Sequence, residues 1–355
     1  MEQQKKRIGY IIFVIILALV MISFFYRLPY SVMKPGEAHD LDPVIRVKGG
    51  HQYDDGDFMF MTVRVVQGIN VYQYLLAKFL KYHKLLPTRD LRLKWESHKE
   101  YEARQLHYMD KSQIEATYVA YERAGKHPQI VHNGLLVIGL IDGMPAENQL
   151  EAGDVIVGAE GKPVKTRKDL FQVMKGKKQG DSVELKIVRD GKKKTVTVSV
   201  AQFPKGYTEN NGDGKKYGIG IIQVPDIALK VNPPIRFDTG GIGGPSGGLM
   251  FSLDIFNQLT EKNWTKGYKI AGTGEINIEG EVGSIGGIKE KVVAADEENV
   301  EIFFAPKKDG NYKNAVEAAK DIGTDMKIVP VKTFDDALDY LRKLPPKNDK
   351  GSKAA

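Results

Sequence analysis

The stretch FDTGGIGGPSGGLMFSLDIFNQLTEK, residues 237–262, places six glycines around a single serine, Ser246, and continues as an apolar segment. Glycine gives the backbone left-handed angles at little steric cost. From Leu249 onward apolar residues recur at helical spacing, so the stretch predicts a Gly-rich loop that enters a helix. Free N–H groups and the positive end of the helix dipole gather there, which favours an oxyanion. Ser246 is therefore a candidate nucleophile, and the alternative is a helix cap.

The positions of the histidines narrow the chemistry open to Ser246. Read as G-x-S-x-G, the loop would suggest an α/β-hydrolase, whose catalytic histidine follows the serine. The last histidine in the chain is His132, so that interpretation is excluded. The chain also has no H-E-x-x-H motif of a zinc peptidase and no cysteine. If Ser246 is a nucleophile, we expect its base to be a side chain other than histidine.

The candidate base lies in EINIEGEVGSIGGIKEKVVAADEEN, residues 275–299, where a helix is expected after the Gly-Gly pair. Lys289 is followed three and four positions later by Val292 and Val293, so we expect it on the apolar side of that helix. Burial lowers the pKa of a lysine, and a base for neutral pH needs a pKa of about 7 to 8 instead of about 10.4. The alternative is a surface lysine whose stem covers apolar neighbours.

Three ordered motifs around these residues resemble the proteolytic domain of Lon-type peptidases. The serine loop GGPSGG at 243–248 is followed by TGEI at 273–276 and by IGGIKEKVVAA at 285–295. The separation between Ser246 and Lys289 is the one that the family uses. GPSGG is also similar to the nucleophile loop of trypsin-like envelope proteases, but those place the protease before the peptide-binding domain described below.

The resemblance to Lon-type peptidases assigns roles to individual side chains. It implies that Ser246 is the nucleophile and Lys289 the general base. It also implies that Thr273 supports the lysine by a hydrogen bond and that N–H groups of the loop hold the oxyanion. The loop residues placed there are Gly244, Pro245 and Gly247.

The sequence departs from the family pattern at two loop positions. Gly247 replaces the usual alanine, which is a small change. Gly243 stands where many members have an acidic residue, so regulation tied to that carboxylate is in doubt. No G-x-x-x-x-G-K-[ST] motif for an ATP-driven motor occurs in the sequence, and we expect no cofactor and no metal.

Residues 126–203 resemble a PDZ domain. The pattern consists of the apolar strand GLLVIGLI, then G-x-PAE, L-x-x-GD-x-I, the helix TRKDLFQVMKG and a hairpin that turns at Asp190-Gly191. The resemblance implies a groove beside the helix near 167–175, where an extended peptide adds as a strand. The loop that would receive the carboxylate of the peptide consists of Asn133, Gly134 and Leu135.

The N-terminal sequence predicts a membrane anchor. The basic residues KKR at 5–7 precede an uncharged apolar run at 8–26. A helix of that length spans about 28 Å, close to the hydrocarbon core of about 30 Å. The positive-inside rule places the N-terminus in the cytoplasm and the other domains outside. The alternative is a cleaved signal peptide, but no small-x-small cleavage site follows the run.

The predicted fold class is α+β, with a transmembrane helix, a β-rich PDZ domain with two helices, and a Lon-type proteolytic α/β domain. In the family the segment before the PDZ domain belongs to the peptidase fold, so we expect residues 38–70 to pair with the final unit. A strand near 219–223 is assigned to that final unit. The expected parts are a basic segment 1–7, the anchor 8–26, a mixed segment 28–125, the PDZ domain 126–203, the Lon-like domain 204–344 and a disordered tail 345–355.

Together these features predict an ATP-independent, membrane-anchored, extracytoplasmic serine endopeptidase. Its expected partners are the lipid bilayer, a further copy of the chain, and unfolded peptides, exposed tails or small membrane proteins that the PDZ domain recruits or gates. The net charge of +7 does not indicate nucleic acid, because lysines cluster at hairpin tips and in the tail without an aromatic-interleaved basic face. The alternative function is an inactive membrane-tethered scaffold that binds peptides.

Overall fold

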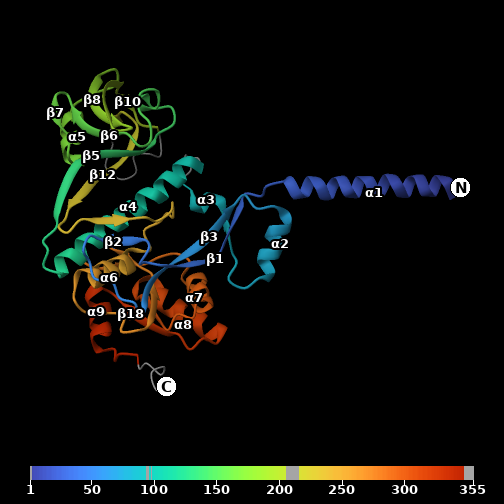
Figure 1. Ribbon diagram of the computed structural model, residues 1–355. Coiled ribbons are helices and arrows are strands. Elements are labelled where there is room, and N and C mark those ends of the chain that lie inside the picture. The colour runs from blue at the N-terminus through green and yellow to red at the C-terminus, as the bar shows by residue number, and fades with distance from the viewer. Residues whose placement is uncertain (1, 93–95, 97, 205–215, 348–355) are drawn as a thin grey trace, which may run out of the picture.

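The computed structural model describes residues 2–92, 96, 98–204 and 216–347. A long helix, α1 (Glu2–Phe25), stands away from a body of two units (Figure 1). The smaller unit is formed by residues 129–230, and the larger unit by the segments before and after it. The predicted α+β class is confirmed.

A six-stranded mixed sheet forms the centre of the larger unit. Its strands, in spatial order, are β18 (Lys327–Val331), β17 (Ile302–Pro306), β14 (Lys269–Gly272), β3 (Asp57–Gln67), β1 (Tyr30–Asp40) and β4 (Lys84–Pro87). β14 runs parallel to β3 and β17, and β17 runs parallel to β18. β1 is antiparallel to both of its neighbours. The pairing of β3 with β14 joins the segment before the smaller unit to the segment after it.

Helices cover both faces of this sheet. They are α2 (Val71–Phe79), α3 (Thr88–Leu91), α4 (His98–Arg123), α6 (Gly248–Leu259), α7 (Ile288–Glu297), α8 (Asn311–Ile322) and α9 (Phe334–Lys343). Phe58 and Phe60 of β3 join the core with α4, α6 and α9, whereas Met59 and Met61 join the core with α7 and α8. Side chains alternate along a strand, so a sheet covered on both faces needs the unbroken apolar run that 58–61 provides.

Helix α6 lies in the middle of the larger core. Every residue from Gly248 to Gln258 is buried, which is typical of a core helix with no solvent-facing side. The sequence predicted only one apolar stripe beginning at Leu249. Because α6 is enclosed on all sides, the loop residue directly before it is held in a fixed position.

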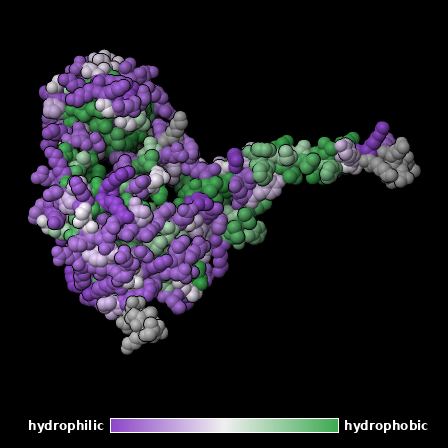
Figure 2. Space-filling model, viewed as in Figure 1, coloured by the Kyte–Doolittle hydropathy of each residue, from purple (hydrophilic) through white to green (hydrophobic). Residues whose placement is uncertain are grey.

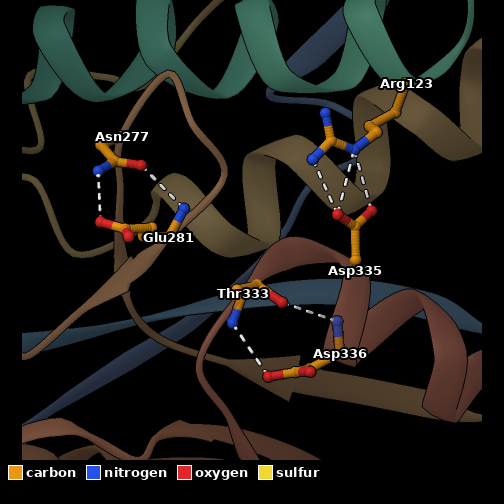
Figure 3. Close-up of polar contacts among 6 residues, drawn as sticks. All are labelled: Arg123, Asn277, Glu281, Thr333, Asp335 and Asp336. Atoms are coloured by element: carbon orange, nitrogen blue, oxygen red, sulfur yellow. Dashed lines mark hydrogen bonds and ion pairs between the residues drawn. The ribbon is translucent and has the colours of Figure 1, made fainter.

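The long helix α4 is fixed to the same unit at its C-terminal end. Arg123 pairs with Asp335 of α9, with Nη2 and Oδ2 2.8 Å apart (Figure 3). Thr333 caps α9 by accepting a hydrogen bond from the Asp336 N–H. Two short ribbons complete the unit: β2 (Ile45–Val47) with β13 (Ile235–Phe237), and β15 (Glu275–Ile276) with β16 (Val282–Gly283).

A second antiparallel sheet forms the smaller unit. Its order is β12 (Ile221–Lys230), β5 (Gln129–Leu140), β6 (Val155–Ala159), β8 (Ser182–Arg189) and β9 (Lys192–Ser199), with β7 (Lys162–Pro163) beside β6. Helix α5 (Arg167–Met174), a 3-10 turn (Pro145–Asn148) and the ribbon of β10 (Ala201–Gln202) with β11 (Tyr217–Gly218) accompany the sheet. The hairpin turns at Asp190-Gly191, where both residues have positive φ, as the sequence predicted.

The structure corrects the boundary between the two units. The strand expected near 219–223 in the final unit is the beginning of β12, which pairs with β5 from Ile221 to Lys230. These residues therefore belong to the smaller sheet, and β5 and β12 form the two-stranded connection to the larger unit (Figure 1). Residues 205–215, which the sequence analysis placed at the start of the Lon-like domain, lie outside the described residues, and so do residues 348–355 of the expected tail.

Helix α1 contains one segment, Arg7–Phe25, that is long and apolar enough to cross a membrane. None of this segment is buried against the rest of the protein. A signal sequence near an N-terminus has the same length and composition, so the helix agrees with either interpretation.

Candidate active site

Ser246 lies at the end of the Gly-rich loop, directly before α6. Gly244 has a φ of +98°, a left-handed angle that favours glycine. Its N–H donates a hydrogen bond to the Gln105 carbonyl of α4 at 2.8 Å. Ser112 of α4 donates to the Pro245 carbonyl at 3.0 Å. Helix α4 therefore holds the loop from the outside.

Lys291 of α7 contacts Ser246. Its Nζ donates to the Ser246 Oγ at 2.6 Å and to the Thr273 Oγ1 at 2.9 Å. The lysine is only 2% exposed, and loss of solvation on burial lowers its pKa to about 7. A substantial fraction of the amine is therefore neutral near pH 7, and a neutral amine can accept a proton from a hydroxyl.

The structure contradicts the prediction of Lys289 as the base. The Lys289 Nζ lies 2.8 Å from the Glu317 Oε2 on α8, and its side chain is 39% exposed. The lysine that contacts Ser246 is 45 residues from it, so the family spacing also selected the wrong residue. The apolar periodicity over the whole of α7, counted from Ile288, identifies Lys291, because the buried stripe of this helix follows the i, i+3, i+4, i+7 pattern. That stripe consists of Ile288, Lys291, Val292 and Ala295.

Thr273 was expected to form a hydrogen bond with Lys289. It forms one with Lys291 instead. The threonine is fully buried, and its Oγ1 donates to the Ser246 carbonyl at 3.0 Å. The Gly274 N–H donates to the same carbonyl at 2.8 Å. The chain that follows β14 thus fixes both the backbone of Ser246 and the Lys291 amine.

The loop amides divide into engaged and available groups. The Gly244 N–H is bound to Gln105, and Pro245 has no N–H. In the described part of the chain, the amides of Ser246 and Gly247 donate no hydrogen bond. Of the three loop residues expected around an oxyanion, only Gly247 keeps an available N–H, and the structure adds that of Ser246.

The glycine at position 247 has a steric reason. A Cβ at this position would lie 2.6 Å from the Phe251 Cζ, closer than Cβ contacts occur. Phe251 is fully buried and packs edge-on against Phe60 and Phe237. The usual alanine of the family therefore does not fit beside this ring.

A cavity of about 530 Å³ opens onto Ser246 and Lys291. Strands β1 and β3, helix α4 and the Gly-rich loop form its walls. His39 is part of the wall and stacks on Phe60, with ring centroids 5.0 Å apart, rather than bonding to Ser246. Among the described residues, no group of His, Asp and Glu could hold a metal ion. The apolar wall residues include Met33, Phe60, Met61, Val63, Val65 and Met109.

The smaller unit contains a second cavity, of about 290 Å³, beside α5. The other side of this groove is residues 217–223, the sequence YGIGIIQ. Phe171 of α5 lines it and is 68% exposed. Gly220 has a φ of +90°, so the backbone turns sharply before β12.

The carboxylate loop predicted from the PDZ resemblance is not at this groove. Asn133, Gly134 and Leu135 lie inside β5, where Gly134 and Leu135 are paired with residues of β12. Leu135 is also paired with β6 on the other side. Their backbone is part of the sheet, so these residues do not form a loop. The backbone on the other side of the groove, β11 and the start of β12, comes from 217–223, a segment that the sequence analysis placed in the Lon-like domain.

Two family models match the chain. Residues 235–343 match the Lon protease (S16) C-terminal proteolytic domain, and residues 118–200 match the PDZ domain. A Lon protease of Metamycoplasma arthritidis (strain 158L3-1) is 31% identical over 156 residues, which is 43% of this chain and 17% of that protein. A Lon protease of Campylobacter concisus (strain 13826) is 30% identical over 209 residues, 57% of this chain and 24% of that protein.

The crystal structure of the PDZ domain of an SdrC-like protein from Listeria monocytogenes is 25% identical and has a TM-score of 0.23. The match covers 27% of the present chain and 93% of the Listeria PDZ domain chain. The present chain matches less than a quarter of the length of either curated Lon protease. The family matches confirm that it contains a Lon-type proteolytic domain, which is the domain of a serine peptidase, and a PDZ domain.

We expect the Lys291→Met variant to remove a pH dependence of stability. Between pH 7 and about 10.5 the unfolded chain keeps the Lys291 proton and the folded chain does not. The unfolded state therefore binds more protons, and stability rises with pH by up to about 1.36 kcal/mol per pH unit in this window. Below about pH 7 the cost of burying the lysine is present in full.

The measurement is denaturant unfolding of the Lon-type domain in the full chain across that pH range. Lys291→Met should be more stable than the parent near pH 7 and should lack the rise toward high pH. Lys289→Met is the matched control, from the same helix, and should keep the rise. Equal pH slopes in the parent and Lys291→Met would show that the amine is not held neutral.

Proposed function

We propose that this chain is a membrane-anchored serine endopeptidase that works outside the cytoplasm without ATP, with Ser246 and Lys291 as its catalytic dyad. The observation that carries this proposal is the 2.6 Å contact between the Lys291 Nζ and the Ser246 Oγ. The contact joins a nucleophile to a base whose pKa lies near 7, in a Lon-type domain. Nucleophilic catalysis needs this combination of contact and matched pKa.

The reaction begins when neutral Lys291 takes the proton of the Ser246 hydroxyl. The Oγ then attacks the scissile carbonyl, and the N–H groups of Ser246 and Gly247, at the positive end of the α6 dipole, stabilise the oxyanion. The Lys291 ammonium next protonates the leaving amine, and the acyl group remains on Ser246. Water loses a proton to Lys291 and attacks the ester. The acyl group leaves as the second product, and the Lys291 ammonium returns the proton to the Ser246 Oγ, which restores the dyad. Thr273 keeps the Lys291 amine oriented toward the Ser246 hydroxyl during both acylation and deacylation.

The shape of the active-site cavity supports an unfolded substrate. About 530 Å³ with apolar walls accepts one or two side chains of an extended peptide, not a folded domain. The sequence contains no G-x-x-x-x-G-K-[ST] motif with which an ATP-driven motor would bind nucleotide. We therefore propose as substrates short peptides, exposed tails and small membrane proteins that need no unfolding.

The proposed location rests on the basic residues 5–7 and the apolar segment of α1. If α1 spans the membrane, the positive-inside rule places the Lon-type and PDZ domains on the extracytoplasmic side. The PDZ groove beside α5 then recruits the C-terminal part of a substrate by strand addition.

Alanine substitutions at Lys289 and Lys291, both in α7, distinguish which lysine is the catalytic base. Ser246→Ala and Lys291→Ala should each lower kcat by on the order of 10³ or more, because each removes a member of one catalytic unit. Lys289→Ala should keep parental activity, since that side chain pairs with Glu317 on the surface. The measurement is the rate at which the full chain in lipid vesicles cleaves unstructured peptides, with the products detected by mass spectrometry. Cleavage that survives in Lys291→Ala excludes the dyad, and a parent without any cleavage favours the peptide-binding scaffold.

The pH profile of cleavage should follow the Lys291 pKa. Protonated Lys291 cannot act as a base, so kcat/KM should rise with pH and reach half of its plateau near pH 7. Histidine-modifying reagents should leave the profile unchanged, because no described histidine bonds to Ser246. The profile is measured with one short peptide over a range of about two pH units on each side of the Lys291 pKa, which is about 7. A plateau that extends unchanged to about two units below that pKa would contradict a lysine base.

The PDZ groove should affect substrate capture rather than chemistry. Phe171→Ala shortens an exposed ring that lines the groove, so KM for peptides with a free C-terminus should rise while kcat stays constant. Val316→Ala, which shortens an exposed apolar side chain on α8, is the matched control. The comparison is steady-state kinetics with a long peptide and with its C-terminally amidated form. An unchanged KM for the long peptide would show that the groove does not recruit it.

A further inference from the structure

Helix α2 exposes a continuous apolar stripe. Its members follow the i, i+3, i+4, i+7, i+8 spacing of one helix face, and their exposure ranges from 42% to 85%. Single exposed apolar residues are ordinary, but a contiguous stripe indicates an interaction surface. The stripe consists of Tyr72, Leu75, Leu76 and Phe79, and of Leu80 at the C-cap that ends the helix.

The opposite face of α2 already packs on the protein. Ala77 is buried with Val32 and Ile69 in a small core, and Tyr74 packs edge-on against Tyr30 with ring centroids 5.1 Å apart. A capping box at Asn70 fixes the start of the helix. The orientation of α2 is therefore set by the protein, and the apolar stripe faces away from the Lon-type domain.

Helix α2 is attached to the end of α1. The Ser23 and Tyr72 hydroxyls are 2.8 Å apart, and the Asn70 side-chain amide donates to the Phe24 carbonyl at 3.1 Å. Figure 1 shows α2 beside the C-terminal end of α1 and running across its direction. In Figure 2 the apolar surface of α1 continues onto this region. When α1 crosses a bilayer, α2 consequently lies at the level of the outer headgroups.

The charges near α2 match an anionic surface. From Gly68 to Arg89 the sequence contains four basic residues and no acidic residue. Two of these residues are paired within the protein, Lys81 with Asp321 and Arg89 with Asp90, while the Lys78 Nζ lies over the Tyr74 ring. Basic side chains at a membrane surface are attracted by anionic lipids, and tyrosine is enriched at the headgroup level. The four basic residues are Lys78, Lys81, Lys84 and Arg89.

We propose that α2 is an interfacial helix whose apolar stripe inserts into the outer headgroup region of the membrane that α1 spans. This inference rests on the membrane anchoring proposed above. The occupant is lipid rather than a second copy of the chain, because the bilayer lies at the level of α2 as soon as α1 is inserted. An amphipathic helix parallel to the surface buries its apolar side at the boundary of headgroups and acyl chains.

The insertion of α2 orients the active site. The chain leaves α2 into β4, and β4 pairs with β1, whose next residues line the active-site cavity. Two contacts with the bilayer, α1 and α2, restrict rotation of the Lon-type domain where α1 alone would leave it free to swivel. The cavity is therefore held at a fixed height, which favours cleavage of tails close to the membrane surface.

The absence of cysteine in the sequence makes a labelling experiment clean. Single-cysteine variants Phe79→Cys and Phe171→Cys carry an environment-sensitive fluorophore in the full chain. The chain is placed in phosphatidylcholine–phosphatidylglycerol vesicles that contain lipids with a nitroxide near the headgroup. The label at position 79 should be quenched severalfold more strongly than the label at 171, an exposed aromatic position on the PDZ domain. Equal quenching at the two positions overturns the proposal.

A second pair of measurements identifies the occupant. Adding Leu75→Glu and Leu76→Glu to the Phe79→Cys chain should reduce the quenching to the level at 171, while cleavage of a short soluble peptide stays parental. In nanodiscs that hold one chain each, the quenching at 79 should persist. Quenching or shielding that requires two chains per disc assigns the stripe to a second copy and overturns the proposal.

Vesicle flotation separates the two levels of the inference. A chain that floats with lipid but lacks selective quenching at 79 retains its anchor and refutes only the role of α2. A chain that does not float refutes the membrane anchoring of the proposed function, and the role of α2 with it.

Discussion

The burial of one amine against one hydroxyl is the constraint on which the rest of the structure depends. Lys291 of α7 loses its solvation on burial, and among the described residues its amine hydrogen-bonds to the hydroxyls of Ser246 and Thr273. Three distant segments must therefore converge: the start of α6, the end of β14 and the middle of α7. A displacement that admits water to the amine would restore its charge and remove the base.

The strands before the PDZ domain help to maintain this burial. Helix α7 begins after Gly287, whose φ is +72°, and a Cβ there would lie 2.7 Å from the Val63 Cγ1 of β3. The start of α7 therefore packs closely on β3, a strand that lies far earlier in the chain. β3 in turn pairs with β14, which leads to Thr273. The Lon-type site is complete only when the segments on both sides of the PDZ insertion are folded together.

Local patterns predicted the local parts of this arrangement. The Gly-rich loop at Ser246 and the helix after it follow from short motifs. The support of a lysine by Thr273 was implied by the family resemblance, which named Lys289, whereas the hydrogen bond is with Lys291. The side of α7 that faces the core was not predicted correctly. The valines at i+3 and i+4 from Lys289 suggested that this lysine is buried, but the side that is buried is decided by the packing of α7 on β1 and β3, which are distant in the sequence. The sheet membership of β12 was missed for the same reason. Its partner β5 lies some ninety residues away, and pairing at that distance leaves no local signal.

Helix α4 connects the serine loop to the PDZ domain, and its contacts limit how the two can communicate. Gln105 holds Gly244 in the first third of the helix, Ser112 holds Pro245 near its middle, and the Arg123–Asp335 pair fixes its end before the chain enters β5. Toward its start, Arg104 is bound to the buried carboxylate of Glu96. A helix fixed at these points resists rotation when the PDZ groove fills. We therefore expect the PDZ domain to act by delivering or blocking a peptide at the cavity, with the shape of the serine loop unchanged.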